Sequence, residues 1–191
     1  MIKDQFEKNK ISWKKSFLDG FSQDENGEAI PWMTYGAIDF LKNNLNKNQQ
    51  VFEFGCGAST LFFANKVKKV VGIETNFRWF EIIQSKLFDI NKKAEITLMT
   101  NGLENNLYQN FAKDYKEKFD FIIIDSLKRF ECAVNSIKAL KPNGAIILDD
   151  SQRQNYKKIF DFFAANNFKK LDFFGIAPGQ LIPKNTTIFF A

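Results

Sequence analysis

Short apolar runs alternate with longer amphipathic segments along the chain from about position 50 onward. The runs are rich in β-branched and aromatic residues, as strands are, and the segments between them have helical spacing. The run 121–125, FIIID, is apolar up to its final aspartate, as expected of a strand buried on both faces. The pattern predicts strands at 50–54, 69–74, 94–99, 119–125, 144–150, 168–174 and 186–191, and helices near 33–46, 59–67, 77–89, 104–115, 129–140 and 153–166.

This alternation predicts an α/β fold with a doubly wound, mostly parallel seven-stranded sheet. The last two strands are separated only by 175–185, which is too short for a crossover helix, so we expect a hairpin and an antiparallel last strand. At 191 residues the chain is expected to form one domain. That domain divides into an N-terminal lead-in with a cap helix, 1–46, and a Rossmann-like core, 47–191.

The composition is that of an ordinary folded protein, with 45% hydrophobic and 26% charged residues. No apolar run approaches the roughly 20 residues needed to span a bilayer, and the N-terminal segment lacks the apolar stretch of a signal peptide. We therefore expect a cytoplasmic protein without membrane contact. Cys56 and Cys132 lack metal-ligand spacing and indicate neither a disulfide framework nor a zinc site.

The net charge is +5, from 27 Lys+Arg against 22 Asp+Glu. The lysines are scattered among Asn, Phe and Ile rather than clustered with interleaved aromatics, so nucleic acid is not the expected partner. Histidine is absent. Any acid–base chemistry must therefore use carboxylates, lysines or other groups in place of imidazole.

The segment 51–60, VFEFGCGAST, combines an apolar strand, a tight glycine turn and the start of a helix. Glycine permits backbone angles and a close ligand approach that a Cβ would block, and free N–H groups at a helix start favour carboxylate or phosphate oxygens. A dinucleotide fingerprint would have a third glycine where this chain has Thr60, and Glu53 would repel a pyrophosphate. A ligand that is cationic at this end tolerates Glu53. The candidate binding residues are Glu53, Gly55, Gly57, Ser59 and Thr60.

A second acidic position, Glu74, ends the strand KVVGIE one strand–helix unit after the glycine turn. A carboxylate there can accept both hydroxyls of a ribose as a bidentate pair. The alternative is a structural turn with a solvated Glu74. Together with the turn, Glu74 favours a site for a ligand that contains a ribose.

Taken together, VFEFGCGAST, VVGIETN, FDFIIIDSLK and LKPNGAIILDD resemble the successive motifs of class I S-adenosylmethionine-dependent methyltransferases, from about Tyr35 to the C-terminus. The resemblance implies a sheet with a reversed last strand and S-adenosylmethionine as cofactor. By motif, Gly55 and Gly57 would pass under the methionine moiety. Glu53 would orient its amino group and Glu74 would hold the ribose.

The same resemblance implies an adenine contact at the end of the third strand. That stretch is Asn101, Gly102 and Leu103 here, without the aspartate common in the family. Trp79 would either wall the adenine or pack in the core. Wall residues are also expected from the segment before the first helix: Pro31, Trp32, Thr34 and Tyr35.

Three aspartates, Asp125, Asp149 and Asp150, end two of the expected strands, so their carboxylates should meet at one edge of the sheet. Such a cluster suits Mg²⁺, which would activate a substrate hydroxyl. It resembles the catechol, caffeoyl-CoA and macrocin-type O-methyltransferases, although the first two have Asp-Asn where this chain has Asp-Asp. Without a metal, Asp125 would contact cofactor or substrate and Asp150 would cap the next helix. The general base would then be Asp125, Asp150 or Lys128.

The acceptor is inferred by elimination. The fourth strand is followed by DSLKR rather than the Asn/Asp-Pro-Pro-aromatic run of amino-methylating nucleic-acid enzymes, and Cys132 lies in a helix rather than at a nucleophile position. We therefore expect O-methylation of a small hydroxylated metabolite, such as a sugar or glycan precursor. The alternatives are methylation of RNA or protein, and a non-catalytic cofactor-binding protein. Since the chain has few insertions, a homodimer could complete a shallow acceptor site.

Overall fold

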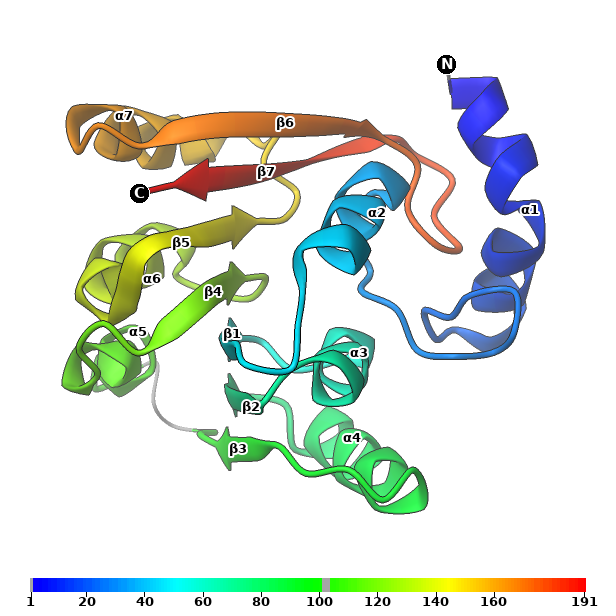
Figure 1. Ribbon diagram of the computed structural model, residues 1–191, viewed down its shortest axis with the longest axis horizontal. Coiled ribbons are helices and arrows are strands. Elements are labelled where there is room, and N and C mark those ends of the chain that lie inside the picture. The colour runs from blue at the N-terminus through cyan, green and yellow to red at the C-terminus, as the bar shows by residue number, and fades with distance from the viewer. Residues whose placement is uncertain (1, 101–103) are drawn as a thin grey trace.

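Seven strands form one sheet in the part of the chain that the computed structural model describes, residues 2–100 and 104–191 (Figure 1). The strand order is β3-β2-β1-β4-β5-β7-β6, and β7 runs antiparallel to both of its neighbours. This is the predicted fold class. The strands are β1 Gln50–Phe54, β2 Lys69–Glu74, β3 Glu95–Leu98, β4 Phe119–Ile124, β5 Leu140–Leu148, β6 Lys169–Gly175 and β7 Lys184–Phe190.

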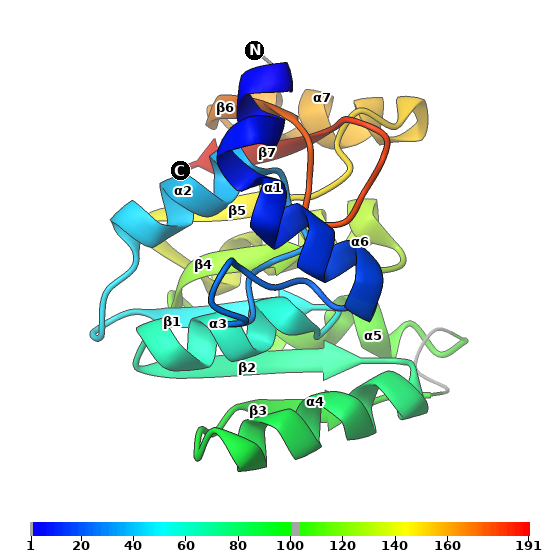
Figure 2. The same cartoon turned by 90° about the vertical axis from the view of Figure 1, so that its right-hand side faces the viewer.

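Helices cover both faces of the sheet, as its central apolar strands require. Phe52 and Phe54 of β1 point into a core beneath α5, α6 and α7, whereas Val51 faces a second core beneath α2 and α3. Figure 2 shows α2, α3 and α4 in front of the sheet, with α5, α6 and α7 behind it. The helices other than α1 are α2 Tyr35–Asn44, α3 Ala58–Lys66, α4 Phe77–Asp89, α5 Leu107–Asn110, α6 Arg129–Ser136 and α7 Lys157–Ala165.

The expected helices begin and end within a few residues of the observed ones, with one clear difference. The segment predicted as a single helix at 104–115 forms the one-turn helix α5 followed by a 3₁₀ turn, Phe111–Asp114. Two more 3₁₀ turns, Ile137–Ala139 and Gln154–Tyr156, lie at the end of α6 and the start of α7. Such turns are common at helix ends.

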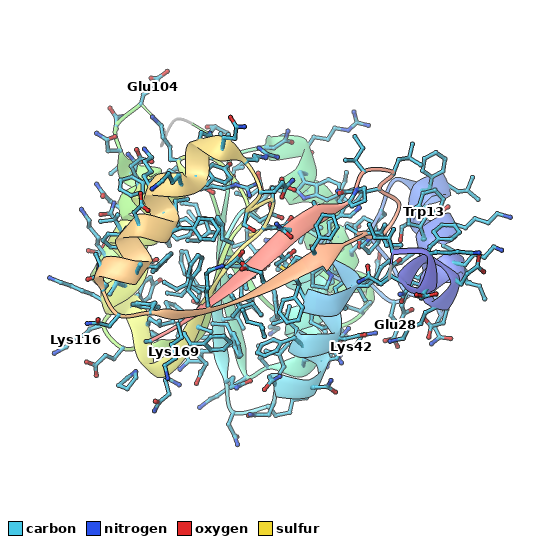
Figure 3. The ribbon with its side chains drawn as sticks, turned by 90° about the horizontal axis from the view of Figure 1, so that it is seen from above. Trp13, Glu28, Lys42, Glu104, Lys116 and Lys169 are labelled. Atoms are coloured by element: carbon cyan, nitrogen blue, oxygen red, sulfur yellow. The ribbon has the colours of Figure 1, made fainter. Side chains whose placement is uncertain are left out.

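The lead-in contains a helix, α1 Ile2–Asp19, which the sequence pattern did not reveal. Its buried positions are Ser12 and Ser16 rather than an apolar stripe. The Ser12 hydroxyl donates to the Gln23 carbonyl at 2.7 Å and lies 2.9 Å from the Tyr35 hydroxyl. Trp13, labelled in Figure 3, donates through Nε1 to the carbonyl of Gln180 in the loop between β6 and β7. Helix α1 is therefore attached by polar contacts together with Phe6 and Trp13, which pack against the core beneath α2 and α3. Two apolar positions make too short a stripe for hydrophobic periodicity to detect.

Among the residues described, the helices are all too short or too polar to cross a lipid bilayer.

The aromatic pair Phe163 and Phe189 allows a test of the core. Phe163 is fully buried on α7 and stacks on Phe189 of β7, with the ring centroids 4.3 Å apart. Phe163→Ala should lower the free energy of unfolding by about 3–5 kcal/mol, because it removes buried surface and leaves a cavity. Phe88→Ala, at a position 86% exposed, should change it by less than about 0.5 kcal/mol. Equal effects in urea denaturation would contradict this packing.

Candidate functional site

A cavity of about 290 Å³ opens at the carboxyl ends of β1, β2 and β4. It brings together the glycine turn, the end of β2 and the residues that follow β4, which are far apart in the sequence. Open parallel sheets bind ligands at this edge. The lining residues are Trp32, Gly55, Cys56, Gly57, Ala58, Ser59, Glu74, Trp79, Asp125 and Ser126.

The backbone conformation requires a glycine at position 55 but not at position 57. Gly55 has a φ of +92°, and a Cβ there would lie 2.7 Å from the backbone oxygen of Asp125. Gly57 is extended, with a φ of −168°. Its N–H donates to the Thr60 hydroxyl at 3.0 Å, and the Thr60 N–H donates back to the Gly57 carbonyl at 3.0 Å. Thr60 is fully buried, and these two hydrogen bonds stabilise the start of α3. It does not line the cavity where it was expected to bind a ligand, whereas Ser59 does.

The carboxylate of Glu74 is held by three backbone N–H groups. Cys56 N donates to Oε2 at 2.9 Å, and Thr75 N and Asn76 N donate to Oε1 at 2.8 and 2.7 Å. These bonds join the glycine turn after β1 to the end of β2. A carboxylate has about four acceptor positions. One position therefore remains for a ligand hydroxyl, rather than the two that a bidentate ribose contact uses.

Glu53 is fully buried beneath the turn and is not part of the cavity lining. Neither carboxyl oxygen has a hydrogen-bond partner within the part of the chain that the structure describes. Burial raises the pKa of Glu53 to about 8, and the nearby Ser59 and Thr60 hydroxyls oppose this rise. A buried carboxyl is costly to ionise, and the Ser59 and Thr60 hydroxyls are the polar groups that lie beside this one.

Two tryptophans wall the cavity. Trp79 Nε1 donates to the Cys56 carbonyl at 2.5 Å, which fixes its ring against the glycine turn. Trp32 Nε1 donates to the Pro178 carbonyl at 2.5 Å, in the loop between β6 and β7. Both rings are therefore oriented by their own hydrogen bonds. The two alternatives for Trp79, cavity wall and core, are both met: its ring lines the cavity and also packs against the core cluster of Leu61, Ile83 and Leu87.

The remaining wall candidates lie away from the cavity. The Tyr35 hydroxyl contacts Ser12 of α1, and burial raises the pKa of Tyr35 to about 12. Thr34 is buried, and its N–H donates to the Thr186 hydroxyl at 3.2 Å. Pro31 is buried and lies outside the lining. The predicted adenine contacts, Asn101, Gly102 and Leu103, lie outside the residues that the structure describes.

Asp125, Asp149 and Asp150 meet as predicted, with one carboxylate oxygen of each within 4.8 Å of the others. Two cations that the sequence did not reveal as site residues lie among them. Lys184 forms ion pairs with Asp149 and, at 3.2 Å, with Asp150.

The second cation, Arg129, pairs with Asp125 at 3.0 Å and with Asp150 at 3.6 Å. Both cationic side chains are only 6% exposed. The cluster therefore carries internal counter-charges at the place where a metal ion was one of the two alternatives.

The cluster sets the proton affinities of its members. Burial, reinforced by Asp149, raises the pKa of Asp125 to about 7, although Arg129 and Lys184 oppose the rise. Burial alone would also raise the pKa of Asp150, but Lys184 and the two arginines outweigh it and lower that pKa. Asp125 lines the cavity, whereas Asp150 is not part of its lining. Asp125 is thus the carboxylate placed to exchange a proton with a ligand at neutral pH.

Lys128, the other predicted base, lies outside the cluster. It precedes α6 with a φ of +51° and is exposed. It lines a neighbouring cavity instead.

Known proteins resemble this chain in sequence and in fold. No protein-family model matches it. An uncharacterized RNA methyltransferase of Mycoplasma mobile is 30% identical over 139 residues, which are 69% of this chain and 36% of the relative. The chain thus spans about a third of the length of that curated relative.

Three solved structures share the fold. An rRNA methylase from Streptococcus thermophilus has a TM-score of 0.60 and 17% identity, over 80% of this chain and 91% of that one. A putative methyltransferase from Streptococcus mutans, in complex with S-adenosylhomocysteine, has a TM-score of 0.56 and 17% identity, over 80% of this chain and 94% of that one. Precorrin 8w decarboxylase of Methanobacterium thermoautotrophicum has a TM-score of 0.61 and 17% identity, over 91% of this chain and 97% of that one. The sequence motifs predicted a likeness to catechol-type O-methyltransferases. The proteins matched here are instead named for RNA or precorrin, or as a putative methyltransferase.

Lys184 allows a test of the internal counter-charge. Lys184→Met should lower the free energy of unfolding by about 3–5 kcal/mol, because Asp149 stays buried without its cation. Lys170→Met removes an exposed ion pair with Asp172 and should cost under about 1 kcal/mol. Millimolar Mg²⁺ should leave the melting temperature of the unaltered protein unchanged. If Mg²⁺ instead raised the melting temperature by an amount equivalent to about 2.7 kcal/mol, as expected for a ligand at a hundred times its Kd, the aspartate cluster would be a metal site after all.

Proposed function

Because the chain has the fold of the class I S-adenosylmethionine-dependent methyltransferases, we propose that it is itself such a methyltransferase. The observation that carries the proposal is the Glu74 carboxylate, held by backbone N–H groups at the rim of a cavity floored by the glycine turn. The open acceptor position on Glu74 would take a ribose hydroxyl. Trp79 would offer a face to the adenine.

The buried carboxyl of Glu53 supports a cationic ligand over an anionic one. Its unpartnered oxygens lie beneath the turn, and the positive amino group of the cofactor would stabilise its charged form through the turn. A pyrophosphate in the same place would add a second negative charge and make the ionisation of Glu53 still less favourable. Bound there, S-adenosylmethionine would supply an electrophilic methyl group.

The chain's own contribution to the reaction is a base. A hydroxyl acceptor must lose its proton as it is methylated, and Asp125 lies on the cavity wall with a pKa near neutrality. Its ion pair with Arg129 fixes the orientation of the carboxylate. We therefore propose oxygen methylation, with Asp125 as the general base.

We propose RNA as the acceptor, which reverses the expectation from sequence. The support is the curated relative named as an RNA methyltransferase and the rRNA methylase that shares the fold. The net charge of +5 agrees with a polyanionic partner. A ribose hydroxyl of the RNA would be the acceptor group whose proton Asp125 removes.

A small hydroxylated metabolite is the second candidate acceptor. It is supported by the fold match to an enzyme named for precorrin, a small molecule. The same Asp125 would serve as base.

Methyl transfer from S-adenosylmethionine carrying a tritiated methyl group tests the proposal, with mixed ribosomal and transfer RNA as acceptor. Label should appear in acid-insoluble material that ribonuclease releases. Label absent from RNA but present in hydroxylated sugars would move the assignment to the second candidate. Absence of any transfer, together with absence of cofactor binding, would remove the methyltransferase proposal itself.

Glu74 should control cofactor affinity. Glu74→Ala removes a charge-assisted hydrogen bond worth about 1.5–3 kcal/mol, so the affinity for S-adenosylhomocysteine should fall roughly tenfold to a hundredfold. Glu81→Ala, at an exposed position on α4, is the matched control and should leave the affinity unchanged. Calorimetric titration measures both, and melting curves check that each variant folds. Equal affinities in all three proteins would refute the role of Glu74.

Asp125 should control the rate and its pH dependence. The base must be ionised, so kcat/KM should rise with pH, reach half its maximum near pH 7 and level off above it. Asp125→Asn should lower kcat by about 10²–10⁴ and abolish that rise, whereas the affinity for S-adenosylhomocysteine stays within a few-fold. A variant that kept the same pH profile would show that another group removes the proton.

A further inference from the structure

A second cavity of about 290 Å³ lies beside the first at the same edge of the sheet. The two share Ser126 in their linings. Its walls come from the residues that follow β4 and from the segment that leads into α7. A molecule in this cavity would therefore lie next to Asp125 without occupying the cofactor cavity.

The lining is strongly basic. Among the described residues it contains Lys128, Arg129, Arg153 and Lys158 but a single acidic residue, Glu131. Arg129 is committed to the aspartate cluster, and Arg153 pairs with Asp150. Lys128 and Lys158 are exposed and have no carboxylate within ion-pair distance among the described residues. Two positive charges are thus left over for an external anion.

Aromatic rings accompany these cations. The Lys158 ammonium lies 4.2 Å from the centroid of the Phe130 ring, and the guanidinium of Arg153 lies 5.9 Å from that of Tyr156. Cations interleaved with aromatic rings are the arrangement that binds single-stranded nucleic acid, where phosphates meet the charges and bases stack on the rings.

The backbone at Lys128 is unusual for its residue type. Its φ of +51° lies in the left-handed region, where most of the other non-glycine residues with positive φ are asparagines. A lysine there costs about 1 kcal/mol or more, and such strain gathers at binding and active sites. This conformation places Lys128 at the start of α6, on the rim of the second cavity.

We propose that the second cavity binds a phosphodiester of the RNA acceptor, next to the nucleotide that presents its hydroxyl to Asp125. This inference rests on the proposed function, whose acceptor it places. Lys128 and Lys158 neutralise the phosphate, and the aromatic rings contact the neighbouring base. Arg153 stays paired with Asp150 and so links the bound phosphate to the aspartate cluster.

Two double variants of equal charge test this placement. Lys128→Ala with Lys158→Ala removes two charges from the second cavity. Lys68→Ala with Lys92→Ala removes two exposed lysines from a different cavity, between β2, α4 and β3. The probe is a short fluorescein-labelled single-stranded RNA of mixed sequence, titrated over a salt series. The first variant should bind the RNA roughly tenfold more weakly, and its salt slope should fall by about 0.7 for each phosphate that the protein no longer neutralises.

The control variant should bind RNA like the unaltered protein, and both variants should bind S-adenosylhomocysteine normally. An equal decrease of RNA affinity in the two variants would mean that net charge alone attracts RNA, which overturns the placement. Saturable binding of a nucleoside diphosphate sugar, without measurable RNA binding, would overturn RNA as the occupant. A failure to bind S-adenosylhomocysteine in the unaltered protein would instead refute the proposed function.

Discussion

Three backbone N–H groups converge on the carboxylate of Glu74, and the shape of the cavity at the ends of β1, β2 and β4 depends on that convergence. One donor, Cys56, belongs to the turn after β1, and the others follow β2. Each bond to a charged acceptor contributes about 1.5–3 kcal/mol. The turn, the start of α3 and the second strand therefore behave as one unit. Gly55 makes the turn sharp enough to pass the Asp125 backbone.

The opposite wall of the cavity depends on a balance of charge. Three carboxylates would repel one another at the ends of β4 and β5, and burial would make their ionisation costly. Lys184 and Arg129 offset this repulsion from within the protein. The result is unequal proton affinities: Asp150 stays ionised, whereas Asp125 titrates near neutrality. In the proposed reaction, a chain without histidine would obtain a base of suitable strength in this way.

Much of this arrangement could be predicted from sequence, because the signals were local. The strands, the glycine turn and Glu74 follow from short patterns, and parallel strands bring their carboxyl ends together wherever they lie in the chain. The meeting of Asp125 with Asp149 and Asp150 followed for the same reason.

The parts that could not be predicted depend on tertiary contacts. Lys184 begins the last strand and reaches Asp149 only because β7 lies beside β5. Helix α1 attaches through buried serine hydroxyls and through only two apolar side chains, Phe6 and Trp13, which form no extended apolar stripe. Tyr35 was expected at the cavity because similar families run this segment beside the cofactor, but the start of α2 turns it toward Ser12 instead.

The glycine turn and Glu74 should bind a methyl donor rather than a dinucleotide, and every proposed role of the other site residues depends on that preference. Calorimetric titration of the unaltered protein with S-adenosylhomocysteine and, separately, with NAD distinguishes the two ligands. We expect one equivalent of S-adenosylhomocysteine to bind with micromolar affinity and millimolar NAD to give no heat of binding. Saturable binding of NAD, with no binding of S-adenosylhomocysteine, would contradict the assignment of this cavity.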